Sequence, residues 1–383
     1  MAGFSSFDDF ISKATASGKF WHQDFVKTSA VNASHVIGNC YDWAVHAGSP
    51  VANLYPGVTL VAQTPTDIGV SGGIYHGGDK GAETKHLVNI GAYASAAAAV
   101  PSVLMLCDSV MYYPTLDVKD TGSKTLVNAN TFTADNNGGN LRLTYTNDFA
   151  TYTSVKFSTT GSLPTGLNNT DIFWLTRLTA TTAAVSTSLA LAIAGTVIAY
   201  TNAGSPTNTM TVTPNRYADG AGLRVYVVCT VQVGNPATTP VLVMTYYNQT
   251  GAEKSLGATI NFTAGGTAIP QVGKILHSGV AANNYGFFLP LAAGDTGIRG
   301  IKTLQFSTAY TTATTLTAAA VLVKPITIAP LVAASVAVER NCMTQLPSLP
   351  RIYDSAALNF LQFAGAATVT ATAINGYIET AWG

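Results

Sequence analysis

The fold of this chain is decided by stretches such as Leu223-Arg224-Val225-Tyr226-Val227-Val228, in which β-branched and aromatic residues follow one another almost without interruption. Such residues are enriched in strands, and runs of four to eight of them, bounded by turn residues, indicate strands rather than helices. Similar runs occur at residues 103–107, 240–247 and 319–323. The sequence therefore predicts a mainly β protein.

Turn signals separate these runs at short intervals. Clusters of Gly, Asn and Ala stand at residues 136–139 and 281–286. Short strands that alternate with such clusters are typical of antiparallel sandwiches. We therefore expect a body that is an antiparallel β-sandwich or jelly-roll-like fold.

One good helix signal stands at the start of the chain. Ser6 can cap a helix, and Phe7, Phe10, Ile11 and Ala14 follow the i, i+3, i+4, i+7 spacing of one helical face. The sequence does not indicate whether this face packs on a sheet of the same chain or on an adjacent subunit. A second, weaker helix is predicted around residues 34–46.

Charge is scarce along the whole chain. Only 10% of the 383 residues are charged, against roughly 25% in ordinary soluble domains. Nineteen basic and nineteen acidic residues cancel, so no electrostatic footprint for nucleic acid or an anionic membrane is present. A surface so poor in charge is typical of proteins whose surface is covered by neighbouring subunits. The sequence therefore predicts a component of an assembly rather than an enzyme.

The cysteines and the apolar stretches limit the cellular setting. Four widely spaced cysteines without a CxxC pair are expected to be buried free thiols. Residues 183–200 are diluted by Ser and Thr, and residues 318–338 contain Lys324, Pro325 and Pro330, so neither is expected to span a membrane. Residues 1–13 show no secretory signal, which predicts synthesis in a cytoplasm.

A change in composition divides the chain into three parts. Thr and Asn become denser between residues 127 and 213, and residues 178–215 contain no charge at all. We interpret residues 127–213 as an inserted β domain, because long insertions in exposed loops add little loop-closure entropy. Residues 1–57 are then an N-terminal helical or extended arm, and residues 58–126 with 214–383 form the β-rich body.

The sharpest chemical cluster comprises His76, Asp79, Glu83 and His86, four potential metal ligands within eleven residues. Zinc and calcium sites use such groups. The spacing fits neither HExxH nor an EF-hand loop, so an exposed polar loop without metal is the preferred interpretation.

Other candidate sites have a structural interpretation beside the chemical one. Asp219 and Asp295 stand next to glycine, as in turns, although a hydrolytic carboxylate pair is the alternative. Residues 69–73 fit GxSxG formally but are expected to form a Gly-rich loop. Adjacent aromatic residues are expected at interfaces rather than as sugar platforms, and they occur at residues 112–113, 246–247 and 287–288.

Two sets of motifs resemble known proteins. The stretch Val155-Lys156-Phe157-Ser158-Thr159-Thr160-Gly161-Ser162-Leu163-Pro164-Thr165-Gly166-Leu167, followed by Ile172-Phe173-Trp174, resembles a small Ig-like β-sandwich module of tailed-bacteriophage structural proteins. The flanking body resembles a family of phage particle proteins, with motifs at residues 216–222, 288–299, 346–353 and 381–383.

This resemblance implies a non-enzymatic virion protein without a cofactor, assembled in the host cytoplasm with copies of itself and other virion proteins. We expect a capsid-associated protein, either a decoration (cement) or a shell protein, present in many copies. The alternative is a tail, collar or fibre protein whose inserted domain binds a receptor or a host surface glycan. A third hypothesis is a virion-borne hydrolase that uses the region of Asp79.

Overall fold

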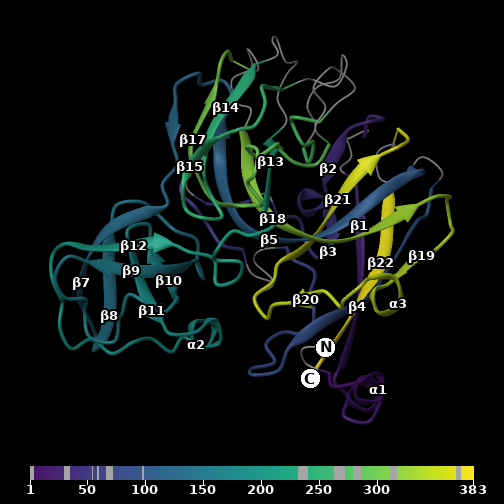
Figure 1. Cartoon of the computed structure of the whole chain (residues 1–383). Coiled ribbons are helices and arrows are strands. Elements are labelled where there is room, and N and C mark those ends of the chain that lie inside the picture. The colour runs from purple at the N-terminus through teal and green to yellow at the C-terminus, as the bar shows by residue number, and fades with distance from the viewer. Residues whose placement is uncertain are drawn as a thin grey trace.

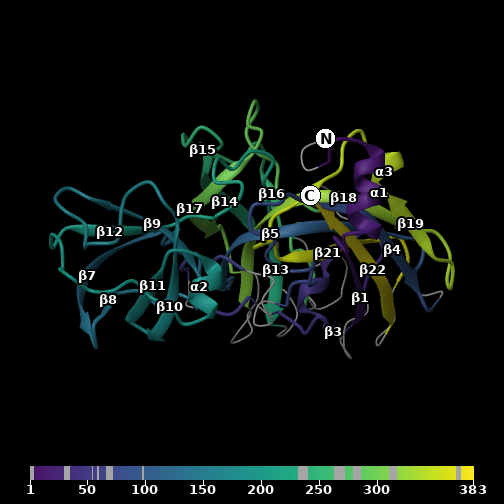
Figure 2. The same ribbon diagram turned by 90° about the horizontal axis from the view of Figure 1, so that it is seen from below.

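The computed structural model is mainly β, as predicted, with several antiparallel sheets and short helices (Figure 1). It describes residues 4–29, 35–53, 55–57, 60–65, 72–96, 99–231, 240–262, 272–278, 286–309, 317–367 and 372–383. A body of packed sheets occupies one side, and a small barrel extends from it on the other side in both views (Figures 1 and 2).

One sheet of the body contains strands from both ends of the chain, in the order β19-β4-β22-β1-β3, with β20 beside β4. β1 pairs with β22 along its whole length, so the N-terminal residues belong to the body instead of forming the separate arm that was predicted for residues 1–57. The strands are β1 (Phe20–Thr28), β3 (Ala47–Ser49), β4 (Lys85–Ala94), β19 (Val338–Asn341), β20 (Arg351–Ile352) and β22 (Ala373–Trp382).

The central sheet has the order β13-β18-β5-β21-β2 and is buried on both faces. In β13, Val225 and Val227 point into one core cluster while Tyr226 and Val228 point into another. Both sets are apolar, which explains the nearly continuous apolar runs of the sequence. The strands are β2 (Cys40–Asp42), β5 (Ser102–Asp117), β13 (Arg224–Val231), β18 (Thr317–Leu331) and β21 (Leu358–Ala364).

A third sheet packs on the central one and has the order β15-β14-β17-β6, with β16 beside β14. Leu242, Met244 and Tyr246 of β14 face the shared core, and the intervening residues are more exposed, as expected for a strand with one solvated face. The strands are β6 (Lys124–Thr125), β14 (Val241–Asn248), β15 (Glu253–Ser255), β16 (Ile260–Asn261) and β17 (Ile298–Phe306).

The segment predicted as an inserted β-sandwich is a closed barrel with the strand order β10-β11-β8-β7-β12-β9. Its core continues into that of the body, and Gln63 of the body accepts hydrogen bonds from Ala150 and Thr153 of the barrel. The elements are β7 (Ala129–Asn137), β8 (Asn140–Tyr145), β9 (Ser154–Thr159), β10 (Phe173–Thr179), β11 (Thr182–Ser186), α2 (Leu189–Ile193) and β12 (Asn208–Val212).

The N-terminal helix α1 (Phe7–Thr15) forms as predicted, and the Ser6 hydroxyl accepts a hydrogen bond from the Asp9 amide at its start. The second predicted helix is wrong: in residues 35–46 the chain forms β2 and only a single helical turn, η1 (Trp43–Val45). Tertiary packing prevails there, because Cys40, Tyr41 and Trp43 are all buried. The remaining helix is α3 (Cys342–Gln345).

The prediction of buried free thiols is confirmed, since all four cysteines are buried and free. Residues 317–331 form one continuous strand, β18, and its pairing with β5 shifts register between Pro325 and Thr327. No helix among the described residues is long and apolar enough to cross a membrane.

Candidate functional site

The structure does not bring the four potential metal ligands together, and the preferred interpretation as an exposed polar loop is wrong for His76 and His86, which are buried. His76 is fully buried, and its Nδ1 and Nε2 atoms lie 2.9 Å from Lys85 Nζ and 3.1 Å from the Ala356 carbonyl oxygen. Burial, assisted by the Lys85 charge, lowers the pKa of His76 to about 3. His76 is therefore a neutral core histidine, held between a lysine and a backbone carbonyl.

The other three candidates also have partners of their own. The Asp79 carboxylate accepts a hydrogen bond from the Gly81 amide, and Glu83 forms an ion pair with Lys19. His86 lies on β4 with Nδ1 3.4 Å from the Leu349 carbonyl oxygen. Throughout the described ranges, no group of three or more His, Cys, Asp or Glu side chains is placed to hold a metal ion.

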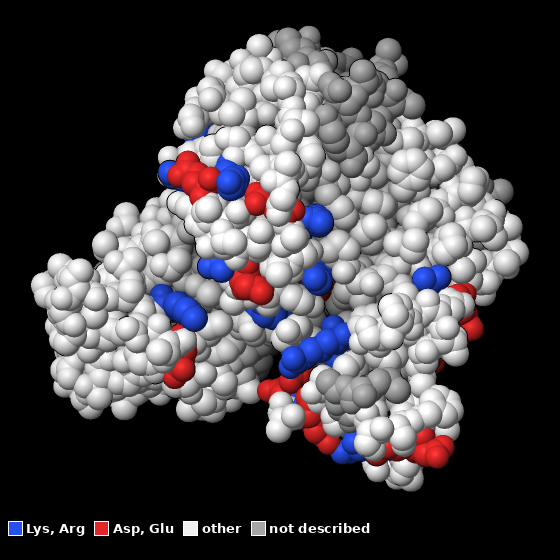
Figure 3. All heavy atoms as spheres, in the orientation of Figure 1, with Lys and Arg blue, Asp and Glu red and all other residues white. Residues whose placement is uncertain are grey.

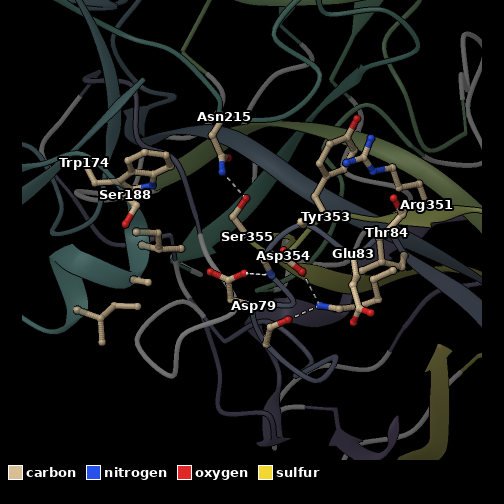
Figure 4. Close-up of a pocket in the computed structure, with 18 of the residues that line it drawn as sticks. Asp79, Glu83, Thr84, Trp174, Ser188, Asn215, Arg351, Tyr353, Asp354 and Ser355 are labelled. Atoms are coloured by element: carbon tan, nitrogen blue, oxygen red, sulfur yellow. Dashed lines mark hydrogen bonds and ion pairs between the residues drawn. The ribbon is translucent and has the colours of Figure 1, made fainter. Parts of the chain in front are cut away.

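Two of these residues, Asp79 and Glu83, instead line a cleft of about 420 Å³ between the barrel and the body (Figure 4). The body contributes the loop that precedes β4 and the turn after β20. The barrel contributes β10 and α2. The lining residues used below are Tyr75, Asp79, Glu83, Lys85, Trp174, Leu189, Ile193, Asn215, Arg351, Tyr353, Asp354 and Ser355.

Lys85 fixes the body wall of this cleft. Its side chain is fully buried, and Nζ lies 3.1 Å from Asp354 Oδ1, 2.9 Å from His76 Nδ1 and in hydrogen-bonding contact with the Gly78 carbonyl. A buried ammonium needs several such partners to offset its lost hydration. Lys85 thereby ties the loop before β4 to the turn after β20.

The point where the chain leaves the barrel is fixed at the same wall. Asn215 donates a hydrogen bond to the Ser355 hydroxyl, as drawn in Figure 4. The next residue, Arg216, donates two hydrogen bonds to the Asp108 carboxylate, and the Ala357 amide donates another. The last strand of the barrel, the central strand β5 and the turn after β20 are thus linked at one place.

The barrel wall is apolar. Along β10, Phe173 and Leu175 point into the barrel core, so the alternation of a strand turns Trp174 outward to the cleft. Leu189 and Ile193 come from α2, whose first turn is capped by the Ser188 hydroxyl. In Figure 4 this wall faces the polar residues of the body across the cleft.

The cleft offers groups that can bind a ligand. The Ser355 hydroxyl receives hydrogen bonds from Asn215 and from Arg216, which lies 3.5 Å away, and neither of these donors can act as a base. Behind this wall, His76 Nδ1 lies 2.9 Å from Lys85 Nζ. Such an arrangement can hold a ligand by hydrogen bonds and stacking.

The remaining candidates have structural places. The Asp219 carboxylate accepts from the Ala221 amide in a turn, and Asp295 accepts from Tyr246 and Asn248, so each has its own local partners. Tyr112 and Tyr113 are both buried, so the interface position expected for that pair is wrong, and the pair is excluded as a sugar platform too. The GxSxG stretch lies largely outside the described residues, since residues 69–71 are not among them.

Sequence reasoning missed most of the cleft. Trp174 was noted only as part of the stretch that resembles a phage module, and Lys85, Asp354 and Ser355 carried no motif. The available signal was the position of Trp174 between two core residues of a strand. The sequence could not predict that the turn after β20 lies close to the loop before β4.

The surface around the cleft carries few charges. On the face shown in Figure 3, acidic and basic side chains gather in a few clusters, and the outer part of the barrel is almost free of them. Comparison of the chain with protein-family models, with curated proteins and with solved structures gave no match.

Proposed function

We propose that this chain is a non-enzymatic structural subunit of a tailed-phage particle, capsid-associated and packed in many copies. The observation that carries the proposal is the apolar face of α1. Only Phe10 of its apolar residues is buried in the chain's own core, whereas Phe7 is 58% and Ile11 43% exposed. A helix capped and amphipathic at this point, with half of its apolar face uncovered, is suited to contact a neighbouring subunit.

The use of charge supports the same proposal. Several charged groups form ion pairs within the chain, including the Arg216–Asp108 pair and the Lys85–Asp354 pair. The surface that remains has few charges to desolvate, and such surfaces associate at low electrostatic cost. The phage setting rests on the motifs at residues 155–167 and in the body.

The proposal is tested by counting copies of this chain in purified phage particles by quantitative mass spectrometry. A copy number that matches the capsid shell or its decoration sites supports it. A number that matches a tail, collar or fibre overturns the capsid assignment in favour of the alternative. Absence of the chain from mature particles overturns the structural role altogether.

A further inference from the structure

We propose that the cleft between the barrel and the body is a binding site for an uncharged saccharide, with the indole ring of Trp174 as the stacking platform. This inference does not depend on the position of the chain in a particle. It rests on the shape of the cleft, on its two chemically different walls and on the balance of its charges.

The cleft has the dimensions of a small-ligand site. Its volume of about 420 Å³ falls within the range of roughly 300–1,000 Å³ that is usual for such sites, which combine an apolar lining with a few convergent polar groups. Here most of the barrel's lining side chains are apolar, apart from Ser188, and the charged side chains come from the body (Figure 4).

Trp174 is available for stacking. The residue is partly exposed, and among the described residues no aromatic ring or cation is stacked on its indole. By contrast, the ring of Tyr353 is covered by the Arg351 guanidinium at 4.3 Å. Because a pyranose has an apolar C–H face, it can bury that face on an indole, with Leu189 and Ile193 extending the apolar wall.

The facing wall presents hydrogen-bonding groups that are already held in place. Lys85 holds the Asp354 carboxylate, whose side chain remains 30% exposed, and Asn215 holds the Ser355 hydroxyl. Arg351, resting on Tyr353, supplies a planar set of donors. A carboxylate acceptor beside guanidinium donors can bind hydroxyl groups, and fixing these groups before binding lowers the entropic cost of association.

The balance of charges decides between ligand classes. Glu83 is neutralised by Lys19, and Asp354 by Lys85. This leaves Asp79 and Arg351 as one charge of each sign on the lining. A phosphate or sulfate ligand would need a cationic excess and an amine an anionic one, so this near-neutral wall favours an uncharged polyhydroxy ligand.

The test uses the full chain and a panel of glucose, galactose, N-acetylglucosamine and their short oligomers. Binding is measured by saturation-transfer NMR and titration calorimetry. We expect at least one of these sugars to bind, Trp174→Ala to weaken that binding about tenfold or more, and Asp354→Asn to weaken it as well. Trp174→Phe should retain part of the affinity, because a smaller ring still stacks.

A matched control is Tyr93→Ala, which removes an exposed aromatic side chain from β4, outside the residues that line this cleft. It should leave saccharide binding unchanged. Circular dichroism and a thermal melt identify a variant that fails to fold, in which case Trp174→Phe and Asp354→Asn decide. Failure of every sugar in the panel to bind, or binding that is indifferent to Trp174→Ala in a folded variant, overturns the inference. A capsid copy number would leave it standing.

Discussion

Arg216 and Asp108 form a bidentate ion pair at the root of the barrel, with Nε–Oδ2 and Nη2–Oδ1 distances of 2.7 and 2.8 Å and with both side chains only 1% exposed. Arg216 also donates to the Ser109 carbonyl, and Asp108 accepts from the Ala357 amide. The pair joins the segment that leaves the barrel to β5, the longest strand of the body. The position of the barrel on the body therefore depends on this pair.

We expect Arg216→Met to lower the free energy of unfolding by about 3–5 kcal/mol, because it leaves the Asp108 carboxylate buried without its partner. The control is Arg142→Met in the exposed pair Arg142–Asp135, which has the same bidentate geometry at 2.8 and 2.7 Å. Exposed pairs are screened by solvent, so the loss in this variant should be far smaller. Equal losses in urea denaturation of the two variants would contradict the structural role of Arg216.

The buried histidines predict a loss of stability in acid. Burial lowers the pKa of His35 and His277 to about 4 and that of His76 to about 3. Unfolded histidine titrates near 6.5, so below that pH the unfolded chain binds more protons than the folded one. Above pH 6.5 the neutral histidines do not lower the free energy of unfolding. As the pH falls from 6.5 towards the pKa of a histidine in the folded state, that histidine lowers the free energy of unfolding by up to about 1.4 kcal/mol per pH unit.

This pH dependence is measured by urea denaturation between pH 7.5 and 5. His277→Gln should make it shallower, because one proton-linked group is lost. His22→Gln is the comparison: although partial burial opposes it, hydrogen bonds to Glu379 and Asp24 raise the pKa of His22, so its contribution has the opposite sign. A stability that is flat across this pH range would show that the buried histidines are not neutral in the fold.

Gly297 marks a close approach of two turns. Its backbone pairs with Ala221, and an added Cβ would collide with the Gly220 carbonyl oxygen and lie 2.7 Å from the Gly222 nitrogen. Since both obstacles are backbone atoms, Gly297→Ala should lower stability by about 1–3 kcal/mol or more. Ala218→Ser, an exposed change in the adjoining turn, should be close to neutral. A thermal melt of each variant checks the difference.

The uncovered face of α1 predicts self-association. Phe7→Ser with Ile11→Ser should change stability little and reduce oligomer formation in sedimentation velocity, because both side chains are exposed in the single chain. Phe10→Ser is the contrasting variant, since Phe10 packs against Phe4 with ring centroids 5.2 Å apart, and it should destabilise the fold itself. Unchanged oligomers in the double variant would remove α1 from the proposed interface.

The sequence by itself determined the fold class, because β-branched runs, turn clusters and a capped helix are local signals that stretches such as residues 223–228 and Ser6 carry on their own. It also indicated, through Thr and Asn density, the segment whose strands close into a barrel. Local patterns failed at residues 35–46, where burial of Trp43 and Tyr41 outweighed helical spacing.

Only the tertiary structure decided which strands share a sheet and which side chains meet. No local sequence pattern predicts that Phe20 pairs with Ala381 or that Lys85 contacts Asp354. His76, Asp79, Glu83 and His86 are close in sequence but do not converge, because His76 and His86 are buried with partners of their own, whereas Asp79 and Glu83 line the cleft. The cleft arose from residues distant in sequence, since ligand sites depend on packing between elements, which periodicity and spacing do not encode.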